Sequence, residues 1–487
     1  MMGLVIAFLL LGVAIPYAVL TFRSRLFLVY PLLAYIMLWP KVFDFLGVIQ
    51  AKGEFGSIQI GDVFYLLFAL VFFVELFLND TVKIVSRHWV PLVSVALYFF
   101  YWLLHLFLLH QEGTARAALN QFRPLAYYLF LVFFLWRIRE EKDVQNVIKV
   151  TCSCAVPAAA MTVLYLYLFG TGYIESILMQ IPGAWYTFKN TDLRFDIINM
   201  KCYLMVAPFL FNLFFFHNVF PHWSRLVQLI SLCCVVFLLL IDQSRAFLLA
   251  EAAGFALALL LLLVKGAVKF ERVLKIVPMV ALLMFAVVTL FLLGDSLAPG
   301  LTEKFEKRLG SISVSGVEQY QKNKEMNSLK SRLDSYTFLL NKIEGNYTFG
   351  RGLGTQIDPY GTFKRFVDSS LLMNLWSGGL IAVVLLSIFL GITLWYSWLG
   401  YVAARESFDI YFFVSSTVSI LVTYVVALQD NILFFGNSVI MFLVLAALVF
   451  AQREVSRDRS LRATTALLEE PTAAVPFQLS HRQLPEG

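Results

Sequence analysis

Charged residues are scarce in this sequence. Only 14% of the 487 residues are Asp, Glu, Lys or Arg, whereas 60% are apolar and the mean hydropathy is +0.77. A soluble protein of this size would carry about 25% charged residues. The deficit argues against an ordinary water-soluble protein and indicates that lipid surrounds most of the surface. The number of membrane spans, and not the chain length, then sets the architecture.

Cysteine is also rare, and several nucleotide and metal motifs are missing. The five cysteines lie in or beside apolar runs, and none has the spacing of a zinc site or a redox pair, so we interpret them as packing residues. The sequence has no P-loop, no DxD-type motif and no internal repeat. We therefore expect no nucleotide-driven step, no metal and no cofactor.

Apolar runs of about 17–25 residues predict membrane-spanning helices. The first run has no basic leader and no small-residue cleavage site, so we expect it to remain in the protein. The prediction is an all-α polytopic membrane protein with about 12–14 transmembrane helices. The predicted spans are 3–21, 26–45, 62–79, 89–109, 118–136, 149–169, 197–217, 226–241, 246–264, 276–294, 369–397, 409–427 and 432–450.

The short loops between these spans alternate in charge. One set is rich in Lys and Arg, and the positive-inside rule places that set in the cytoplasm. The N-terminus and the loops 46–61, 110–117, 170–196 and 242–245 then face the outside. The basic residues of the inner set are Arg23, Arg25, Lys83, Arg87, Arg137, Arg139, Lys142, Arg225, Lys265, Lys269, Arg272, Lys275, Arg405, Arg453, Arg457, Arg459 and Arg462.

This topology divides the chain into four parts. Residues 1–294 form an N-terminal bundle of about ten helices, and residues 295–368 form a long helical loop on the outer, periplasmic side. Residues 369–452 form the C-terminal transmembrane helices. The cytoplasmic tail, 453–487, has few large apolar residues and several Pro, Glu and Arg, so it is predicted to be disordered.

Three arginines lie at the outer membrane boundary in this topology. Arg123 is near the outer end of the fifth span, Arg245 begins the ninth span directly after Ser244, and Arg332 lies in the outer loop. Each one alone is also compatible with a snorkelling or solvated side chain. Their position against the positive-inside trend favours a functional reason. Because a guanidinium group binds oxygens in pairs and stays charged, such arginines suit a diphosphate.

The sequence around Arg332 predicts an amphipathic helix that lies on the bundle. Arg332 is placed at the edge of its apolar stripe. The FGRGLG run that follows, Phe349 to Gly354, does not come after a strand and lacks the spacing of a dinucleotide fingerprint, so its glycines predict a sharp turn after Asn346. The stripe consists of Leu329, Leu333, Tyr336, Leu340 and Ile343.

Carboxylates are the candidates for a general base. Asp368 stands just before the eleventh span, where it could accept the proton of an attacking hydroxyl or simply cap the helix. Glu344, Asp334 and Glu251 are weaker candidates for the same role. Histidines are less promising, because His105 and His110, near the outer end of the fourth span, are interpreted as structural.

These motifs resemble the O-antigen polymerase and O-antigen ligase superfamily of bacterial membrane glycosyltransferases. The resemblance rests on Ser244-Arg245 after a short outer hairpin, and on an outer loop with Arg332, a helix over 333–343 and the glycine turn. Ligases carry His-Asn where this chain has Asp368-Ser369, which favours a polysaccharide polymerase. Further matches are Asp62 at the start of an early span, Arg123, and the step Gly379-Leu380-Ile381.

The resemblance implies a GT-C-type bundle in the bacterial inner membrane, with a cavity open to the periplasm. The implied activity is polymerisation of undecaprenyl-diphosphate-linked repeat units of a capsule, exopolysaccharide or O-antigen, without a metal and with inversion. Partners would be the lipid-linked donor and acceptor, a chain-length regulator and a flippase, with no nucleic acid. Ligase-type transfer and transport of lipid-linked glycans stay open as alternatives. Implied diphosphate ligands are Arg123, Arg245 and Arg332, the implied base is Asp368, and secondary candidates are Asp62, Ser244 and Glu344.

Overall fold

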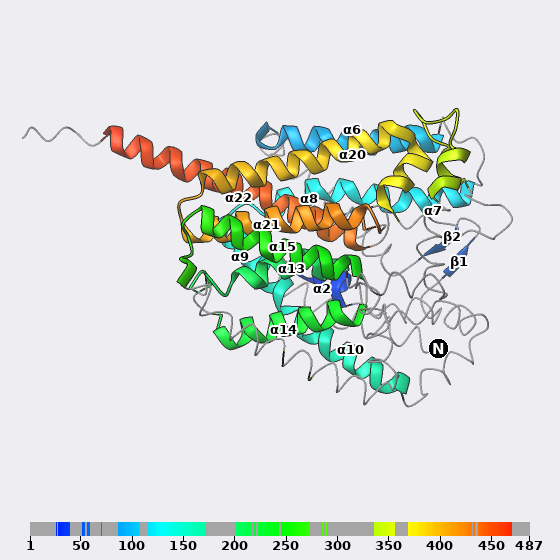
Figure 1. Cartoon of the computed structure of the whole chain (residues 1–487). Coiled ribbons are helices and arrows are strands. Elements are labelled where there is room, and N and C mark those ends of the chain that lie inside the picture. Colours follow the sequence, from blue (N-terminus) through cyan, green and yellow to red (C-terminus); the bar gives the residue numbers. More distant parts are fainter. Residues whose placement is uncertain are drawn as a thin grey trace, which may run out of the picture.

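The computed structural model is dominated by helices that lie side by side (Figure 1). Three predicted spans, 3–21, 62–79 and 276–294, lie outside the described residues except for isolated positions. The structure describes residues 26, 28–38, 51–53, 56–58, 70, 86–107, 115–170, 201–216, 218–220, 223–242, 245–271, 285, 289, 336–355, 369–430, 432–433 and 437–469.

The described helices follow the predicted apolar runs along the chain. They are α2 (Val29–Leu38), α6 (Trp89–Phe107), α7 (Ala115–Ala126), the 3-10 helix η1 (Tyr127–Leu129), α8 (Phe130–Arg137), α9 (Glu141–Ser153), α10 (Ala155–Gly170), α13 (Lys201–Asn212), α14 (Arg225–Asp242), α15 (Arg245–Val264), α20 (Ser370–Ala403), α21 (Ser407–Ala427) and α22 (Asn437–Glu469). A short antiparallel hairpin, β1 (Ala51–Gly53) and β2 (Gly56–Ile58), pairs Lys52 with Ser57 within a predicted outer loop.

Seven of the described helical segments are long and apolar enough to cross a membrane. This confirms a helical protein of the membrane type, and the additional predicted spans stay predictions. Two of the seven run through several elements, because α7, η1 and α8 continue one another and α9 continues into α10. The segments are Trp89–Phe107, Ala117–Arg137, Glu141–Leu164, Phe247–Val264, Ser370–Ala403, Ser407–Ala427 and Asn437–Thr465.

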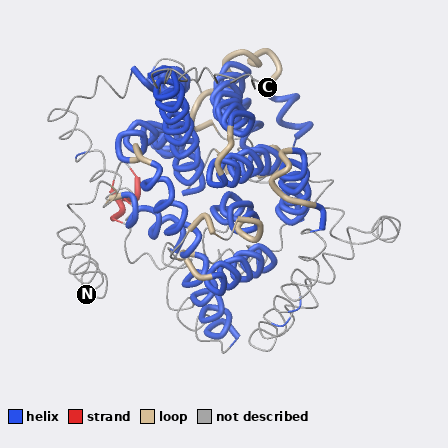
Figure 2. The backbone as a smooth tube through the Cα atoms, turned by 90° about the vertical axis from the view of Figure 1, so that its left-hand side faces the viewer, coloured by secondary structure: helices blue, strands red, loops and turns tan. Residues whose placement is uncertain are grey.

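The centre of the bundle is built on α21, which packs against α13, α15, α20 and α22 (Figures 1 and 2). Small hydroxyl side chains line this buried helix and allow close approach of its neighbours. Their polar groups are bonded: Ser415 Oγ donates to Tyr411 O at 2.7 Å, and Ser419 Oγ donates to Met205 O of α13 at 2.9 Å. Both serine hydroxyls therefore have a hydrogen-bond partner, and that of Ser419 joins α21 to α13.

Contacts along α21 establish which helix ends lie together. Along α13, Met205 is bonded to Ser419 and Asn212 to Ser415, so α13 runs antiparallel to α21. Gly254 of α15 packs on Val418 and Val422, and Lys265, just after α15, donates to Tyr401 O shortly before α21 begins, so α15 is antiparallel to α21 as well. Ser369, before α20, donates to Ala427 O at 3.4 Å. The helices α13, α15 and α20 consequently begin where α21 finishes. We name this the Ala427 end, and the opposite end of the bundle the Arg459 end.

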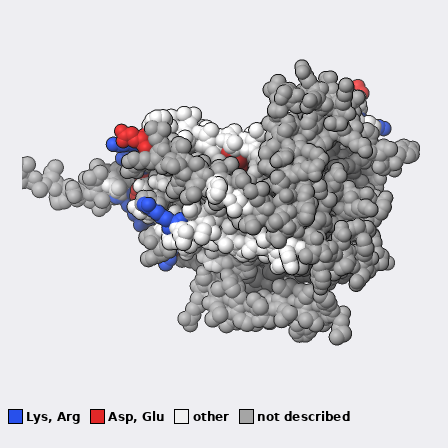
Figure 3. All heavy atoms as spheres, turned by 60° about the horizontal axis from the view of Figure 1, so that its bottom comes forward, with Lys and Arg blue, Asp and Glu red and all other residues white. Residues whose placement is uncertain are grey.

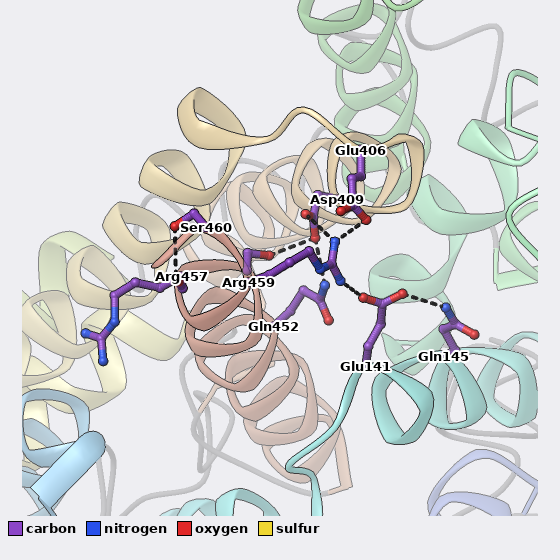
Figure 4. A network of polar contacts seen from close by, with 9 residues as sticks. Glu141, Gln145, Glu406, Asp409, Gln452, Arg457, Arg459 and Ser460 are labelled. Carbon is purple, nitrogen blue, oxygen red and sulfur yellow. Dashed lines mark hydrogen bonds and ion pairs between the residues drawn. The ribbon is translucent and has the colours of Figure 1, made fainter. Parts of the chain in front are cut away.

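At the Arg459 end a network of polar side chains joins three helices (Figure 4). Arg459 of α22 forms ion pairs with Glu141 of α9, with Glu406 just before α21, and with Asp409 of α21. The Asp409 carboxylate also accepts hydrogen bonds from Gln452 Nε2 at 2.7 Å and from Ser456 Oγ at 2.8 Å. This carboxylate is almost fully buried, and these donors compensate for its lost hydration.

The same network corrects the prediction for the C-terminal tail. Residues 453–469 belong to α22 and are helical, so the prediction of disorder is wrong for this part, and residues 470–487 lie outside the described residues. Ion pairs account for the helical structure of this part. Arg459 pairs with three carboxylates outside α22, and Arg457 pairs with Glu454, one turn earlier, at 2.6 Å. The prediction of disorder was based on the scarcity of large apolar residues, and that criterion takes no account of ion pairs.

The Arg459 end also collects residues of the predicted cytoplasmic set. Lys265 donates to Tyr401 O and Val402 O at the end of α20, while Arg87 and Arg139 lie beside α22. The charged side chains drawn in colour in Figure 3 gather mainly where α22 leaves the bundle, and a few more lie at the opposite edge. This distribution agrees with the predicted alternation of the loops, and the side of the membrane stays a prediction.

Replacing Arg459 by alanine should lower the free energy of unfolding by about 1–3 kcal/mol, because partly buried carboxylates lose their shared cation. Thermal unfolding of the detergent-solubilised protein measures this effect. Arg457→Ala is the matched control: its side chain is 53% exposed and pairs within its own helix, so the expected change is below about 0.5 kcal/mol. Equal changes in both variants would contradict an anchoring role for Arg459.

Candidate functional site

The helix α20 is broken near the Ala427 end, at Gly379. This residue has φ 66° and ψ −166°, a backbone conformation that is essentially restricted to glycine. The break releases carbonyl groups before Gly379 and N–H groups after it from their helical partners. These groups lie in an apolar bundle, so each one needs another partner.

The glycine turn supplies most of those partners. Arg351 N donates to Trp376 O at 2.7 Å, Gly352 N donates to Ser377 O at 3.0 Å, and Leu380 N donates to Tyr347 O at 2.7 Å. Tyr101 Oη of α6 donates to Gly378 O at 2.5 Å. The predicted turn after Asn346 is confirmed by positive φ angles at Gly350, Gly352 and Gly354.

The other face of the turn meets α7. Gly354 N donates to Gln121 Oε1 at 2.8 Å, and a Cβ atom on Gly354 would lie 2.5 Å from Ala118 N. The turn is thus wedged between α20 and α7. Arg123 follows Gln121 on α7 and is half-buried, with its Nε in the protein interior. The structure therefore places Arg123 on the helix that holds the glycine turn.

The amphipathic helix before the turn is present over residues 336–342, but its buried face differs from the prediction. Leu339 and Ile343 are fully buried, whereas Leu340 is 39% exposed. The reason is that Leu339 packs against Trp376 of α20, a partner that helical spacing alone does not identify. Arg332, Leu329 and Leu333 lie outside the described residues.

The beginning of α20 is fixed by two serines. Ser369 is the N-cap, and its Oγ accepts a hydrogen bond from Leu372 N at 3.3 Å. The interpretation of Asp368 as the helix cap is therefore wrong, and Asp368 itself lies outside the described residues. Ser370 donates through N and Oγ to Asp430 O at 3.1 and 2.9 Å, which joins α20 to the loop after α21.

A polar pair at this point was missed by sequence reasoning. Lys201 Nζ, on the first residue of α13, lies 2.5 Å from Asp430 Oδ1, and each side chain is about one-quarter exposed. Lys201 meets the criterion by which Arg245 was selected, because it is also a cation near the predicted outer end of a span. Asp430 carries no such signal, because a short polar loop between two spans is expected to contain an acidic residue.

The remaining predicted site residues are distributed as follows. Arg245 is the first residue of α15, so its backbone lies at the Ala427 end, and its side chain is outside the described part. Ser244 and Asp62 are also outside it. Glu344 is exposed after the amphipathic helix. Glu251 is buried within α15, and neither of its carboxylate oxygens has a hydrogen-bond partner in the part of the chain that the structure describes.

The two histidines near the end of the fourth predicted span have different outcomes. His105 of α6 is buried, and its Nε2 lies 2.9 Å from Tyr101 Oη, the hydroxyl that bonds to the break of α20. This position agrees with a structural role. His110 lies outside the described residues. Within the described stretches, no group of three or more His, Cys, Asp or Glu side chains is arranged to hold a metal ion.

Comparison with known proteins adds no relative to these observations. No family model and no curated protein sequence matches this chain. The interpretation of the Ala427 end therefore depends on its own geometry and on the short motifs of the sequence.

The Ala427 end is electrostatically suited to an anion. Helix N-termini carry partial positive charge, because their first N–H groups have no intrahelical partner. Among the helices that begin here, three start at Lys201, Arg245 and Ser370, and two of these first residues are cationic. A phosphate or diphosphate group at this end would meet both kinds of positive charge. The Asp430 carboxylate beside Lys201 adds a proton acceptor.

Proposed function

We propose that this protein is a membrane glycosyltransferase that polymerises oligosaccharide repeat units carried on undecaprenyl diphosphate, at its Ala427 end. The observation that carries the proposal is the common start of α13, α15 and α20 around the Lys201–Asp430 pair, with Arg245 as the first residue of α15. The Arg459 end, with its basic residues, would face the cytoplasm. The Ala427 end would then face the periplasm.

The proposed reaction exchanges one bond at the anomeric carbon of the donor. The bond from this carbon to a diphosphate oxygen breaks, while a bond to the acceptor hydroxyl oxygen forms on the opposite face, with inversion. The lipid diphosphate leaves with the bonding electrons and gains negative charge. Arg245, Lys201 and the helix N-termini would stabilise that charge as it develops. A carboxylate, Asp368 or Asp430, would take the hydroxyl proton.

The glycine turn has a positioning role in this proposal. It anchors the end of the outer loop to α20 and α7, and it holds the helix over residues 336–342 against Trp376. Arg332 precedes that helix by only four residues, a distance of at most about 14 Å along an extended chain. The turn would therefore restrict how far Arg332 can lie from the beginning of α20.

The break in α20 bears on the alternative of a transporter. Transporters use broken helices because the released backbone groups bind ions or substrates. Here the groups flanking Gly379 are bonded to the glycine turn and to Tyr101, so they are already occupied by the protein. This favours a transferase. Ligase-type transfer to another acceptor remains the second alternative, and the Asp368-Ser369 pair in place of His-Asn favours polymerisation.

Reconstitution separates these functions. The purified full-length protein in liposomes is supplied with an undecaprenyl-diphosphate-linked oligosaccharide, and the products are resolved by gel electrophoresis. A ladder of increasing length supports polymerisation, and a single transfer to a second glycan supports a ligase. Movement of the lipid-linked glycan across the bilayer, without any new glycosidic bond, would reject the transferase proposal.

In this assay, Asp368→Asn should lower turnover by about 100-fold or more, as the loss of a general base requires. Because Ser369 provides the helix cap, the substitution should leave thermal stability unchanged. Asn341→Ala, at an exposed side chain of the same outer segment, is the control and should keep its activity. Full turnover in the Asp368 variant would shift the role of base to Asp430.

A further inference from the structure

A cavity of about 300 Å³ lies at the Arg459 end, between α6, α8 and α22. Arg87 and His88, just before α6, form one wall, and Arg139, just after α8, continues it. Glu454 and Asp458 of α22 form the opposite wall, and apolar residues of α8 and α22 complete the lining. The volume is at the lower end of the range for ligand sites. No residue of the proposed glycan site lines this cavity, so the inference stands independently of the proposed function.

The cationic wall presents two guanidinium groups. Arg139 Nε donates to Trp136 O at 2.8 Å, and its guanidinium lies 4.7 Å from the centre of the Trp136 ring, which orients the planar group. Arg87 is exposed and has no ion pair within the described part of the chain. Burial, together with the charges of Arg87 and Arg457, lowers the pKa of His88 to about 4. His88 is therefore neutral near pH 7 and adds hydrogen-bonding capacity without charge.

Two carboxylates, those of Glu454 and Asp458, line the α22 side of the cavity, and the charges of Arg87, Arg453 and Arg457 all act on Glu454. Glu454 and Asp458 are four residues apart on α22, so they project from the same face and repel each other. Arg457 pairs with Glu454 at 2.6 Å. Asp458 forms no ion pair with any described residue, Arg87 included, although both line the cavity. A cation between Asp458 and the opposite wall would relieve this repulsion.

The cavity thus offers arginines on one side and, on the other, the Asp458 carboxylate, which has no ion pair among the described residues. A ligand that carries a phosphate and an ammonium group a short distance apart matches both walls at once. The cavity lies where the apolar spans end, next to Trp89, which begins α6 and is 60% exposed. An exposed tryptophan at the end of a span is typical of the lipid headgroup level.

We propose that this cavity binds the headgroup of phosphatidylethanolamine, with the phosphate on Arg87 and Arg139 and the ammonium on Asp458. Phosphatidylglycerol has a phosphate but no cation for Asp458. Phosphatidylcholine has a cation, but its trimethylammonium group has no N–H to donate to a carboxylate. The geometry therefore distinguishes three common headgroups through one residue, Asp458.

The test is direct binding of lipids to the full-length protein in detergent, measured by native mass spectrometry. Short-chain forms of the three phospholipids are titrated, together with soluble phosphoethanolamine. Phosphatidylethanolamine should bind about tenfold more tightly than the other two, as expected for one charge-assisted hydrogen bond. Asp458→Asn should remove the preference over phosphatidylglycerol, and Arg87→Gln should weaken the binding of both.

Arg462→Gln is the matched control, because this exposed arginine lies on the same helix and does not line the cavity. It should bind the lipids as the unmodified protein does. Equal or tighter binding of phosphatidylglycerol to the unmodified protein would overturn the proposal, and so would an intact preference in the Asp458 variant. If soluble phosphoethanolamine binds as tightly as the lipid, the ligand is not a membrane component.

Discussion

Replacing Gly379 by alanine should lower the free energy of unfolding by more than about 3 kcal/mol. The backbone conformation at Gly379 is strained for any residue with a side chain, at a cost of about 1–3 kcal/mol. A Cβ atom would also lie 2.3 Å from Thr348 O and 2.5 Å from Gly350 N, so the glycine turn would have to move. Each lost backbone hydrogen bond between the turn and α20 adds about 1 kcal/mol.

The matched control is on the same helix. A Cβ atom on Gly391 of α20 meets no atom within 4 Å. Gly391→Ala should therefore stabilise the helix by about 0.5–1 kcal/mol, the ordinary advantage of alanine over glycine. Thermal unfolding of both variants in detergent gives the comparison. If Gly379→Ala unfolds at the same temperature as the unmodified protein, the broken form of α20 is not the stable one.

Arg245→Ala should reduce polymer formation by about 100-fold or more while leaving the amount of folded protein unchanged. A positive group that contacts the leaving diphosphate more strongly in the transition state contributes on this scale. Arg332→Ala should have a similar effect for the same reason. The reconstituted polymerisation assay measures both, and thermal unfolding confirms that neither loss arises from misfolding.

Arg225 provides a control with the same local context. It is the first residue of α14, as Arg245 is of α15. It lies near the Arg459 end of the bundle, because the ring of Phe220, shortly before it in the chain, is 6.2 Å from the ring of Phe408 at that end. Arg225→Ala should keep normal activity. Cysteine labelling from each side of the membrane adds an independent check. Positions 245 and 332 must react from the same side, since opposite accessibility would rule out a shared diphosphate site.

Local patterns in the sequence predicted most of the described helices. The predicted span 409–427 corresponds to α21, Ser407–Ala427. This prediction succeeded because the length of an apolar run is by itself a strong signal for a membrane helix. The turn after Asn346 was predictable as well, since glycines at such spacing seldom allow regular structure. The sequence did not predict that this turn would enter a break in α20. The pair Gly378-Gly379 is compatible with a continuous helix until its distant partner is known.

Contacts between remote segments account for what sequence reasoning missed. Lys201 and Asp430 are 229 positions apart, and neither residue contains information about the other. The choice of Leu339 over Leu340 as the buried residue depends on Trp376 in the same way. Arg332 and Asp368 lie outside the described residues, so their roles stay predictions.

The break at Gly379 has a consequence for membrane depth. Residues 380–403 of α20 extend about 36 Å at 1.5 Å per residue, which is enough by itself to cross a hydrocarbon layer of about 30 Å. The segment Ser370–Gly378 is therefore surplus to the crossing and turns aside from the helix axis (Figure 1). Under the proposed function, this buried segment and the glycine turn bonded to it would lie near the outer membrane surface, at the depth where a lipid carrier holds its diphosphate.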